Sequence, residues 1–303
     1  MSVNSASVKS VEPIARATWK DYIVLTKPRV ISLLLFTTLA AMFIAKDATH
    51  PVTALMFLGV AIGGYMSAGA ANAFNMVYDS DIDGRMERTT SRPTVTHVIS
   101  AHDALIFGFA LEICSFVILT AVSNVLAASL ALAGLLFYVF IYTMLLKRRT
   151  WQNIVIGGAA GAFPPLVGWA AVAGHLNGFA WLLFAIIFVW TPVHFWALAI
   201  LIKDDYEKAG VPMLPVVKGD KATVVQIVGY AYVTVLCTIA PYFIGKAHWL
   251  YLVGAVLLNM QLIKMCYQLK ATIARKQASG LFHYSMIYLA ALFLLLAVDH
   301  LIL

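Results

Sequence analysis

The sequence has little charge for its length. Of its 303 residues, 12% are charged and 62% are hydrophobic, whereas a soluble domain carries about 25% charged residues. So few charges cannot cover a globular surface, which excludes an ordinary soluble protein and indicates that lipid is its main solvent. The 17 Phe, 13 Tyr and 7 Trp residues exclude a disordered chain. The three cysteines all lie in apolar stretches, which excludes a disulfide scaffold.

Long apolar stretches recur along the chain. A transmembrane helix needs about 20 mostly apolar residues. The stretches exceed the length of a strand and lack the alternation of an outer-membrane barrel. The sequence therefore predicts an all-α, polytopic membrane protein with nine transmembrane helices. The predicted spans are residues 29–46, 52–78, 103–122, 125–146, 152–173, 179–202, 223–244, 248–269 and 283–301.

The basic residues are sorted to one side of these spans. If the N-terminus is cytoplasmic, all of the 21 Lys and Arg residues except Lys46 and Lys246 lie on the cytoplasmic side, as the positive-inside rule requires. This pattern predicts a cytoplasmic segment over residues 1–28, a single membrane-embedded domain over 29–303 and a C-terminus outside. It also accounts for the net charge of +7, so a nucleic-acid partner is not expected. Because no apolar secretory signal precedes the spans, a bacterial plasma membrane is the simplest location.

The acidic residues are concentrated as well. Eight of the 14 lie in two cytoplasmic connections, after the second and the sixth span. In the first connection Asn75, Asp79 and Asp83 are spaced i, i+4, i+8, so a continued helix places them on one face. Two carboxylates and an amide oxygen suit Mg²⁺, although the acids could instead only solvate a helix end. A calcium-binding EF-hand loop is disfavoured, because its twelfth position is Thr90 where a Glu is needed.

The second acidic connection has lysines beside its acids. Asp204 and Asp205 are expected to complete the metal site if the two connections face each other. Metal ions and basic side chains together bind diphosphate, although topology alone could explain the arginines. The candidates for diphosphate binding are Arg88, Arg92, Lys147, Lys203 and Lys208.

Several stretches resemble a known group of intramembrane enzymes. The spacing of Asn75, Asp79 and Asp83 after a second span, with another acidic loop after the sixth, resembles the prenyltransferase superfamily typified by 4-hydroxybenzoate polyprenyltransferase. Within that superfamily the chain is similar to the protohaem IX farnesyltransferase family. The similar stretches are Leu25–Val30, Arg88–Pro93, Asn153–Pro165, Trp190–Ala199 and Asp204–Pro215.

The resemblance implies a fold and a reaction. The fold would be nine helices around a central cavity that opens sideways to lipid. The reaction would transfer a farnesyl group from farnesyl diphosphate to a vinyl group of haem B, with Mg²⁺ as the ion. The product would be haem O for a terminal oxidase, so haem A synthase or the oxidase assembly would be a partner. The second motif departs from the Asp-x₃-Asp pair that is common in the superfamily, because the residue four positions after Asp204 is Lys208. The resemblance therefore implies metal binding more firmly for the first motif than for Asp204 and Asp205.

The remaining candidates would form the catalytic centre and the pocket. Departing diphosphate needs metal and positive charge beside it, and an allylic cation needs a dry, electron-rich pocket. Each pocket residue could equally be one that only packs between helices. The expected catalytic residues are Asp79, Asp83, Arg88, Arg92, Lys147 and Lys203. The expected haem and prenyl pocket residues are Arg29, Tyr142, Asn153, His194 and Trp196.

Two other functions fit parts of the pattern. The same fold could act on another acceptor, such as an aromatic precursor of a quinone. A cation-coupled transporter could use the acids as ion sites. Transporters often place such acids at the middle of the bilayer, however, whereas these acids lie at its predicted cytoplasmic edge.

Overall fold

The computed structural model describes residues 17–47 and 49–302. Within these residues the chain forms helices and no strands. Nine of the described helices are long and apolar enough to cross a membrane, which confirms the predicted all-α, polytopic architecture. Residues 1–16 of the predicted N-terminal segment, with Lys9 and Arg16, lie outside the described residues.

The predicted spans recur as helices in the same order. The spanning elements are α2 (Pro28–Ala45), α3 (Ala54–Tyr78), α5 (Ala101–Val122), α6 (Val125–Leu136) continued by the π-helix η2 (Phe137–Leu146), α7 (Asn153–Gly157) with α8 (Ala159–Ala173), α9 (Gly178–Leu201), α11 (Leu214–Phe243), α12 (Trp249–Ala271) and α13 (Arg275–Ile302). The short elements are α1 (Trp19–Thr26), α4 (Ser80–Asp83), the 3₁₀ turn η1 (Glu87–Thr89) and α10 (Lys203–Lys208).

Two helices begin earlier than the hydropathy predicts. The prediction placed the start of α11 at residue 223, but the helix begins at Leu214 and is interrupted at Gly219, whose φ is 80°. The prediction placed the start of α13 at residue 283, but this helix begins at Arg275. In α13, hydropathy marks only the part that suits the hydrocarbon core, whereas polar residues begin the same helix in the water-rich edge. In α11, the residues before Gly219 form a separate short turn that is too brief to register as a span.

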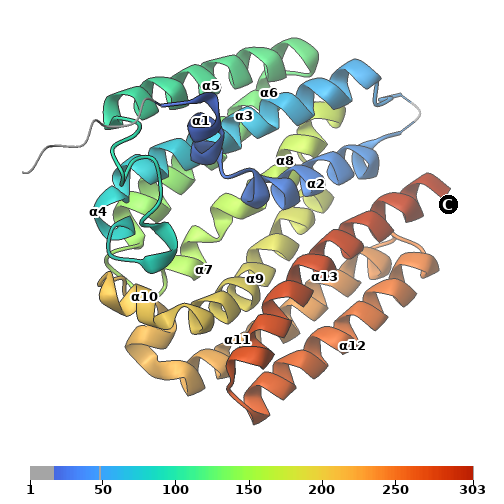
Figure 1. Cartoon of the computed structure of the whole chain (residues 1–303). Coiled ribbons are helices and arrows are strands. Elements are labelled where there is room, and N and C mark those ends of the chain that lie inside the picture. Colours follow the sequence, from blue (N-terminus) through green and yellow to red (C-terminus); the bar gives the residue numbers. More distant parts are fainter. Residues whose placement is uncertain (1–16, 48, 303) are drawn as a thin grey trace, which may run out of the picture.

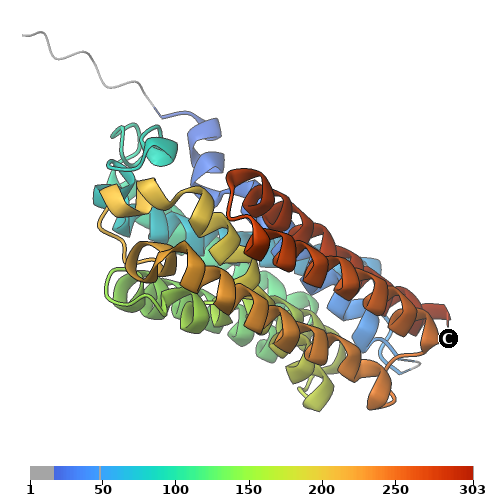
Figure 2. The same cartoon turned by 90° about the horizontal axis from the view of Figure 1, so that it is seen from below.

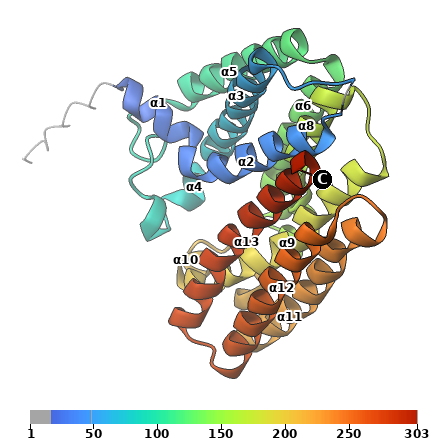
Figure 3. The same ribbon diagram turned by 90° about the vertical axis from the view of Figure 1, so that its right-hand side faces the viewer.

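The nine spans pack in a ring. Each spanning helix packs against the next one in the order α2, α3, α5, α6, α8, α9, α11, α12 and α13. The ring closes because α13 returns to α2, and Figures 1 and 3 show the red α13 beside the blue α2. Further contacts of α2 with α8 and of α9 with α13 connect helices that lie far apart in the sequence.

A missing side chain permits the contact between α2 and α8. A Cβ atom on Gly168 of α8 would lie 1.9 Å from the backbone oxygen of Thr38 in α2, whereas one on Gly161 of the same helix meets nothing within 4 Å. Small residues let membrane helices approach closely. Gly168 is therefore needed for packing at this point, and Gly161 is not.

The short elements gather at one end of the ring. Figure 2 shows the cyan segment around α4 and the gold α10 at one end of the long helices, and the C-terminus at the opposite end. We call the end with α4 and α10 the site end. Both acidic connections lie there, as the topology predicts, because an even number of spans separates them.

Candidate functional site

The candidate site begins where α3 ends. Asp79 follows the last residue of α3, and α4 continues the helical path after it. The backbone N–H of Asp79 donates to the carbonyl of Asn75 at 2.9 Å, and that of Asp83 donates to the carbonyl of Asp79 at 2.8 Å. Because each step is one helical turn, the three side chains follow one another along one face. This confirms the arrangement that their spacing predicts, and we call these three residues the α3 line.

The carboxylates of the α3 line are buried, and in the described residues one oxygen of each accepts no hydrogen bond. Asp79 and Asp83 are both 0% exposed, and Oδ1 of each lacks a hydrogen bond. Asn75 is buried beside them, and its amide nitrogen donates to Oδ2 of Asp79 at 2.7 Å and to Oγ1 of Thr143 at 3.1 Å. A buried oxygen that accepts no hydrogen bond is costly, so these two oxygens mark a place for a cationic ligand.

This donor set fits a hard cation that keeps other oxygen ligands. Across the described residues, no three His, Cys, Asp or Glu side chains lie close enough together to hold a metal on their own. Mg²⁺ is typically bound through one or two carboxylates together with water and the phosphate oxygens of a substrate. Two carboxylates and an amide are therefore a set that suits Mg²⁺ carried by a diphosphate.

Basic side chains lie directly against the α3 line. Lys147, just after η2, donates to Oδ2 of Asp79, and Arg92 donates to Oδ2 of Asp83. Lys147 is only 8% exposed, and buried charges are normally paired in this way. The structure thus brings together five of the predicted residues, two of them from the basic set and three from the metal set.

The π-helix η2 contains Thr143, which accepts from Asn75, and ends just before Lys147, which pairs with Asp79. The N–H of Lys147 donates to the carbonyl of Tyr142 at 2.8 Å, five residues back, so the wide turn ends at this lysine. Within η2 the rings of Tyr138 and Tyr142 stack with centroids 5.5 Å apart. Such π turns are frequent at functional sites, and hydropathy gives no signal for them.

Arg148 is a further basic residue that the sequence did not single out. Its guanidinium binds both carboxylate oxygens of Asp81 at 2.7 Å and the carbonyl of Tyr78 at 2.8 Å. It also lies 3.5 Å from Oδ1 of Asp79. The hydrogen bonds from Arg148 lower the pKa of Asp81, so this exposed acid is held as a carboxylate outside the α3 line.

Lys27 is the residue of the site that sequence reasoning missed. It separates α1 from α2 and has the left-handed φ of 53°, a strained conformation for a residue with a side chain. Its ammonium group donates to Oδ1 of Asn75 at 2.7 Å. Burial, and then the charges of Arg92 and Lys147, lower the pKa of Lys27 to about 7. The available signal was Pro28, because a helix usually breaks before a proline.

The second acidic cluster lies apart from the α3 line. Asp204 is exposed and Asp205 partly exposed, and in the described chain neither makes an ion pair or side-chain hydrogen bond with that line. Lys203 donates to Asp220 at 3.1 Å, and Lys208 is exposed. These four residues therefore lie at the site end but are not part of the buried cluster around Asp79 and Asp83.

Tyr206 is the buried residue of α10 in the second acidic connection. Its ring is buried, and this burial raises the pKa of its phenol. The positive charges of Arg88 and Arg92 oppose the shift, whereas the negative charges of Asp79 and Asp205 add to it. Charged groups of both acidic connections therefore act on this one phenol. Arg88 itself is exposed.

His194 is held rigidly in the ring interior. Its imidazole lies between the rings of Trp190 and Phe282, with centroids 4.6 Å and 4.7 Å away. Nδ1 lies 2.8 Å from Oγ of Ser285, whose hydroxyl proton is donated to the carbonyl of Phe282 at 2.7 Å. When that hydroxyl donates to Phe282, it accepts from Nδ1–H, and in this tautomer Nε2 carries the free lone pair. A fixed imidazole with a free nitrogen is suited to bind a metal centre or a hydrogen-bond donor.

The other predicted pocket residues occupy different places. Asn153 is 0% exposed and donates to the carbonyl of Lys147 at 3.2 Å, and in the described residues its Oδ1 accepts no hydrogen bond. It therefore supports the lysine that pairs with Asp79. Trp196 is fully buried and packs edge-on against Tyr230. Arg29 is exposed on the first turn of α2. Of these three, only Asn153 directly supports the cluster around Asp79.

Comparison with known proteins identifies the family. Residues 34–297 match the family model described as the UbiA prenyltransferase family. The chain belongs to the UbiA prenyltransferase family. This prenyltransferase is 53% identical over 304 residues to a protein of Deinococcus radiodurans named protoheme IX farnesyltransferase, covering 97% of each chain. The resemblance inferred from the sequence motifs is thereby confirmed.

Other relatives support the same assignment. A Thermus thermophilus protein, also named protoheme IX farnesyltransferase, is 59% identical over 283 residues, which are 93% of this chain. The chain spans 46% of the length of that relative. Among solved structures, a digeranylgeranylglyceryl phosphate synthase has a TM-score of 0.76 at 20% identity, covering 94% and 99% of the two chains. A UbiA homologue from Archaeoglobus fulgidus bound to GPP and Mg²⁺ has a TM-score of 0.65 at 16% identity, covering 91% and 99%.

Proposed function

We propose that this prenyltransferase transfers the farnesyl group of farnesyl diphosphate to a vinyl group of haem B and, with addition of water, forms haem O. The observation that carries the proposal is the buried α3 line, in which two carboxylate oxygens accept no hydrogen bond within the described residues and Lys147 and Arg92 lie alongside. Relatives named protoheme IX farnesyltransferase support haem as the acceptor.

The α3 line would hold the metal–diphosphate end of the substrate. Asp79 and Asp83, with Asn75, would bind Mg²⁺, and Asp204 and Asp205 would add ligands from the facing connection. When bound, Mg²⁺ would stabilise as a Lewis acid the negative charge that develops on the diphosphate. The Archaeoglobus fulgidus homologue bound to GPP and Mg²⁺ supports this assignment.

The basic residues would stabilise the diphosphate as it leaves. Lys147 and Arg92 already lie against the carboxylates, so their charges stand where the diphosphate would bind. Three further basic residues lie outside the buried cluster and would contact the outer oxygens of the diphosphate. They are Arg88, Lys203 and Lys208. Charges placed before the reaction stabilise the departing group without reorganisation, which is the role proposed for these five residues.

The transfer itself would occur among aromatic side chains. The bond between farnesyl C1 and the diphosphate oxygen breaks, and the diphosphate leaves with the electron pair. The π electrons of the haem vinyl group form the new bond to C1, and water quenches the resulting cation with loss of a proton. Tyr142 would stabilise the allylic cation through its π face, while Arg29, Asn153, His194 and Trp196 would position the haem and the prenyl chain.

The location proposed for the reaction is a bacterial plasma membrane. The described helices support a polytopic protein, and the named relatives are bacterial. The site end and the N-terminal segment, residues 1–28, would face the cytoplasm, with residues 29–303 as one membrane domain and the C-terminus outside. Haem O would then pass to haem A synthase or to a terminal oxidase assembly.

The acceptor can be tested directly. The full chain in phosphatidylcholine nanodiscs is incubated with farnesyl diphosphate, Mg²⁺ and either haem B or 4-hydroxybenzoate, and the products are identified by mass spectrometry. The proposal expects haem B to gain one farnesyl and one hydroxyl group, and the aromatic acid to stay unchanged. Prenylation of the aromatic acid instead would assign the enzyme to quinone-type chemistry. No product from either acceptor with folded protein would exclude the proposed activity.

A further inference from the structure

The site end of the last three spans carries positive charge that nothing in the described chain neutralises. Between residues 209 and 298 the only acid is Asp220, and Lys203 already binds it at 3.1 Å. None of the other basic side chains at this end lies within 4.0 Å of a carboxylate in the described residues. These residues are Lys218, Lys221, Lys264, Lys270, Arg275 and Lys276.

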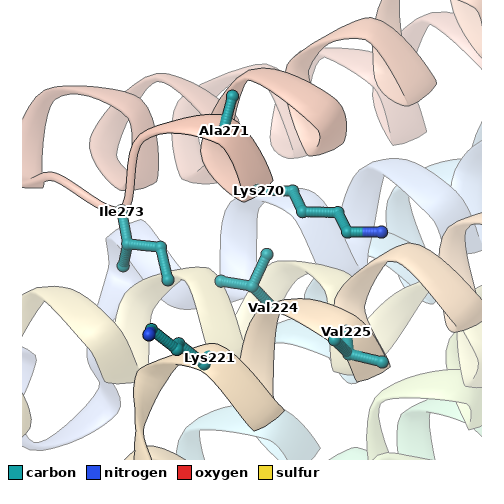
Figure 4. A pocket seen from close by; sticks show the side chains of 6 residues that line it. All are labelled: Lys221, Val224, Val225, Lys270, Ala271 and Ile273. Atoms are coloured by element: carbon teal, nitrogen blue, oxygen red, sulfur yellow. The ribbon is translucent and has the colours of Figure 1, made fainter.

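Two of these lysines border one hollow. A cavity of about 470 Å³ lies between α11 and α12, lined by Lys221, Val224, Val225, Lys270, Ala271 and Ile273. Figure 4 shows the ammonium groups of the two lysines on opposite sides of the apolar floor. A second hollow of about 490 Å³ shares Ala271 and includes Lys276. The positive-inside rule explains the sign of these charges, but not why lysines from two helices flank an apolar hollow.

An apolar track continues from this hollow along α11. Val225 is 60% exposed and Leu236 is 65% exposed, and the spacing of residues 225, 229, 232 and 236 places them on one face of the helix. Gly229 leaves open space on that face, because a Cβ there would meet nothing within 4 Å. The hydroxyls of Tyr232 and Tyr267 lie 2.9 Å apart and join α11 to α12 at the side of the track.

We propose that the hollow between α11 and α12 binds an anionic phospholipid, with its phosphate between Lys221 and Lys270 and one acyl chain along the track past Gly229. The charge suits a phosphate, and basic pockets between membrane helices are known places for anionic headgroups. The apolar floor and track decide for a lipid over free phosphate, because a free anion gains nothing from them. The site lies outside the α3 line and is independent of the acceptor proposed above.

The test measures bound lipid by native mass spectrometry. The full chain in neutral detergent is titrated with phosphatidylglycerol or phosphatidylcholine of the same acyl chains. The double variant Lys221→Gln/Lys270→Gln removes the charges at the hollow. The matched control Lys218→Gln/Lys264→Gln removes the same charge at the same end without touching either hollow. The variant Gly229→Leu fills the track and leaves all charges in place.

The expected result is a preference for phosphatidylglycerol that the hollow variant weakens about 20- to 30-fold, about fivefold for each lysine. The control double variant should bind phosphatidylglycerol like the parent protein. Gly229→Leu should also weaken the binding of the lipid. Equal losses in both double variants would show a diffuse surface charge and overturn the site. Displacement of the lipid by millimolar inorganic phosphate, or equal binding of phosphatidylcholine, would overturn it as well.

Discussion

Replacing Lys147 with methionine should destabilise the protein, because the change leaves a buried carboxylate without its cation. Lys147 is 8% exposed and contacts Asp79, which is 0% exposed. Removing one partner of a buried ion pair costs about 3–5 kcal/mol. The carboxylate keeps the hydrogen bond from Asn75 at 2.7 Å and the nearby charge of Arg148 at 3.5 Å. We therefore expect the lower end of that range, about 3 kcal/mol.

A double variant separates the effect of an unpaired buried charge on stability from the effect on enzyme activity. Asparagine has the shape of aspartate without its charge, so Lys147→Met combined with Asp79→Asn buries no unpaired ion. This double variant should recover most of the lost stability. It should nevertheless fail to form haem O, because it lacks both a proposed metal ligand and a proposed diphosphate ligand.

Thermal unfolding in detergent, followed with a thiol-reactive fluorophore, measures the effect. The assay uses a Cys114→Ser/Cys237→Ser background, because Cys114 is exposed and Cys237 is partly exposed. The remaining thiol, Cys266, is 0% exposed and reacts only when the helices separate. At about 2 °C for each kcal/mol in a chain of this size, Lys147→Met should lower the midpoint by about 6 °C, and the double variant should lie within about 2 °C of the parent. A single variant as stable as the parent, or a double variant no more stable than the single one, would refute the reasoning.

Three further changes test other parts of the structure. Gly168→Ala should lower the midpoint by several degrees, because overpacking costs about 1–3 kcal/mol, while Gly161→Ala in the same helix should change it little; equal effects would contradict the close approach of α2 and α8. Asp299→Ala should cost about 1–3 kcal/mol in the same assay, because this buried carboxylate accepts from two backbone amides at the start of α12. Arg92→Met should slow haem O formation about 100-fold, and Arg92→Lys less because it keeps the charge facing Asp83; the opposite order would argue against a role for that charge.

The features that the sequence predicted are those governed by local rules. Spans are set by runs of apolar residues, because a backbone in lipid must satisfy its hydrogen bonds internally. The α3 line follows from helical spacing alone, since Asn75, Asp79 and Asp83 need only a continued helix to share a face. For Lys147 and Arg92 the sequence shows only that they lie on the same side of the membrane as these carboxylates and have the opposite charge. It does not show that they contact Asp79 and Asp83.

The features that sequence reasoning missed depend on tertiary contacts. The contact of Lys27 with Asn75 needs a left-handed residue between two helices, and a single sequence shows only the proline that follows. The π-helix η2 has the composition of an ordinary apolar helix. Asp204 is exposed and makes no ion pair with the α3 line in the described residues, so its proposed role as a metal ligand stays a prediction. Asn75 lies 48 residues from Lys27, so local pattern carries no information about that contact.

The central claim is that the α3 line is the metal–diphosphate site, and metal-dependent turnover in matched variants tests it most directly. Initial rates of haem O formation are measured against Mg²⁺ concentration for Asp79→Asn, Asp83→Asn and Asp81→Asn. Asp81 lies between the other two in sequence but is exposed and held by Arg148. We predict that Asp79→Asn and Asp83→Asn abolish turnover, that Asp81→Asn keeps most of it, and that EDTA stops the parent enzyme. Full turnover in EDTA, or in either buried variant, would contradict the account.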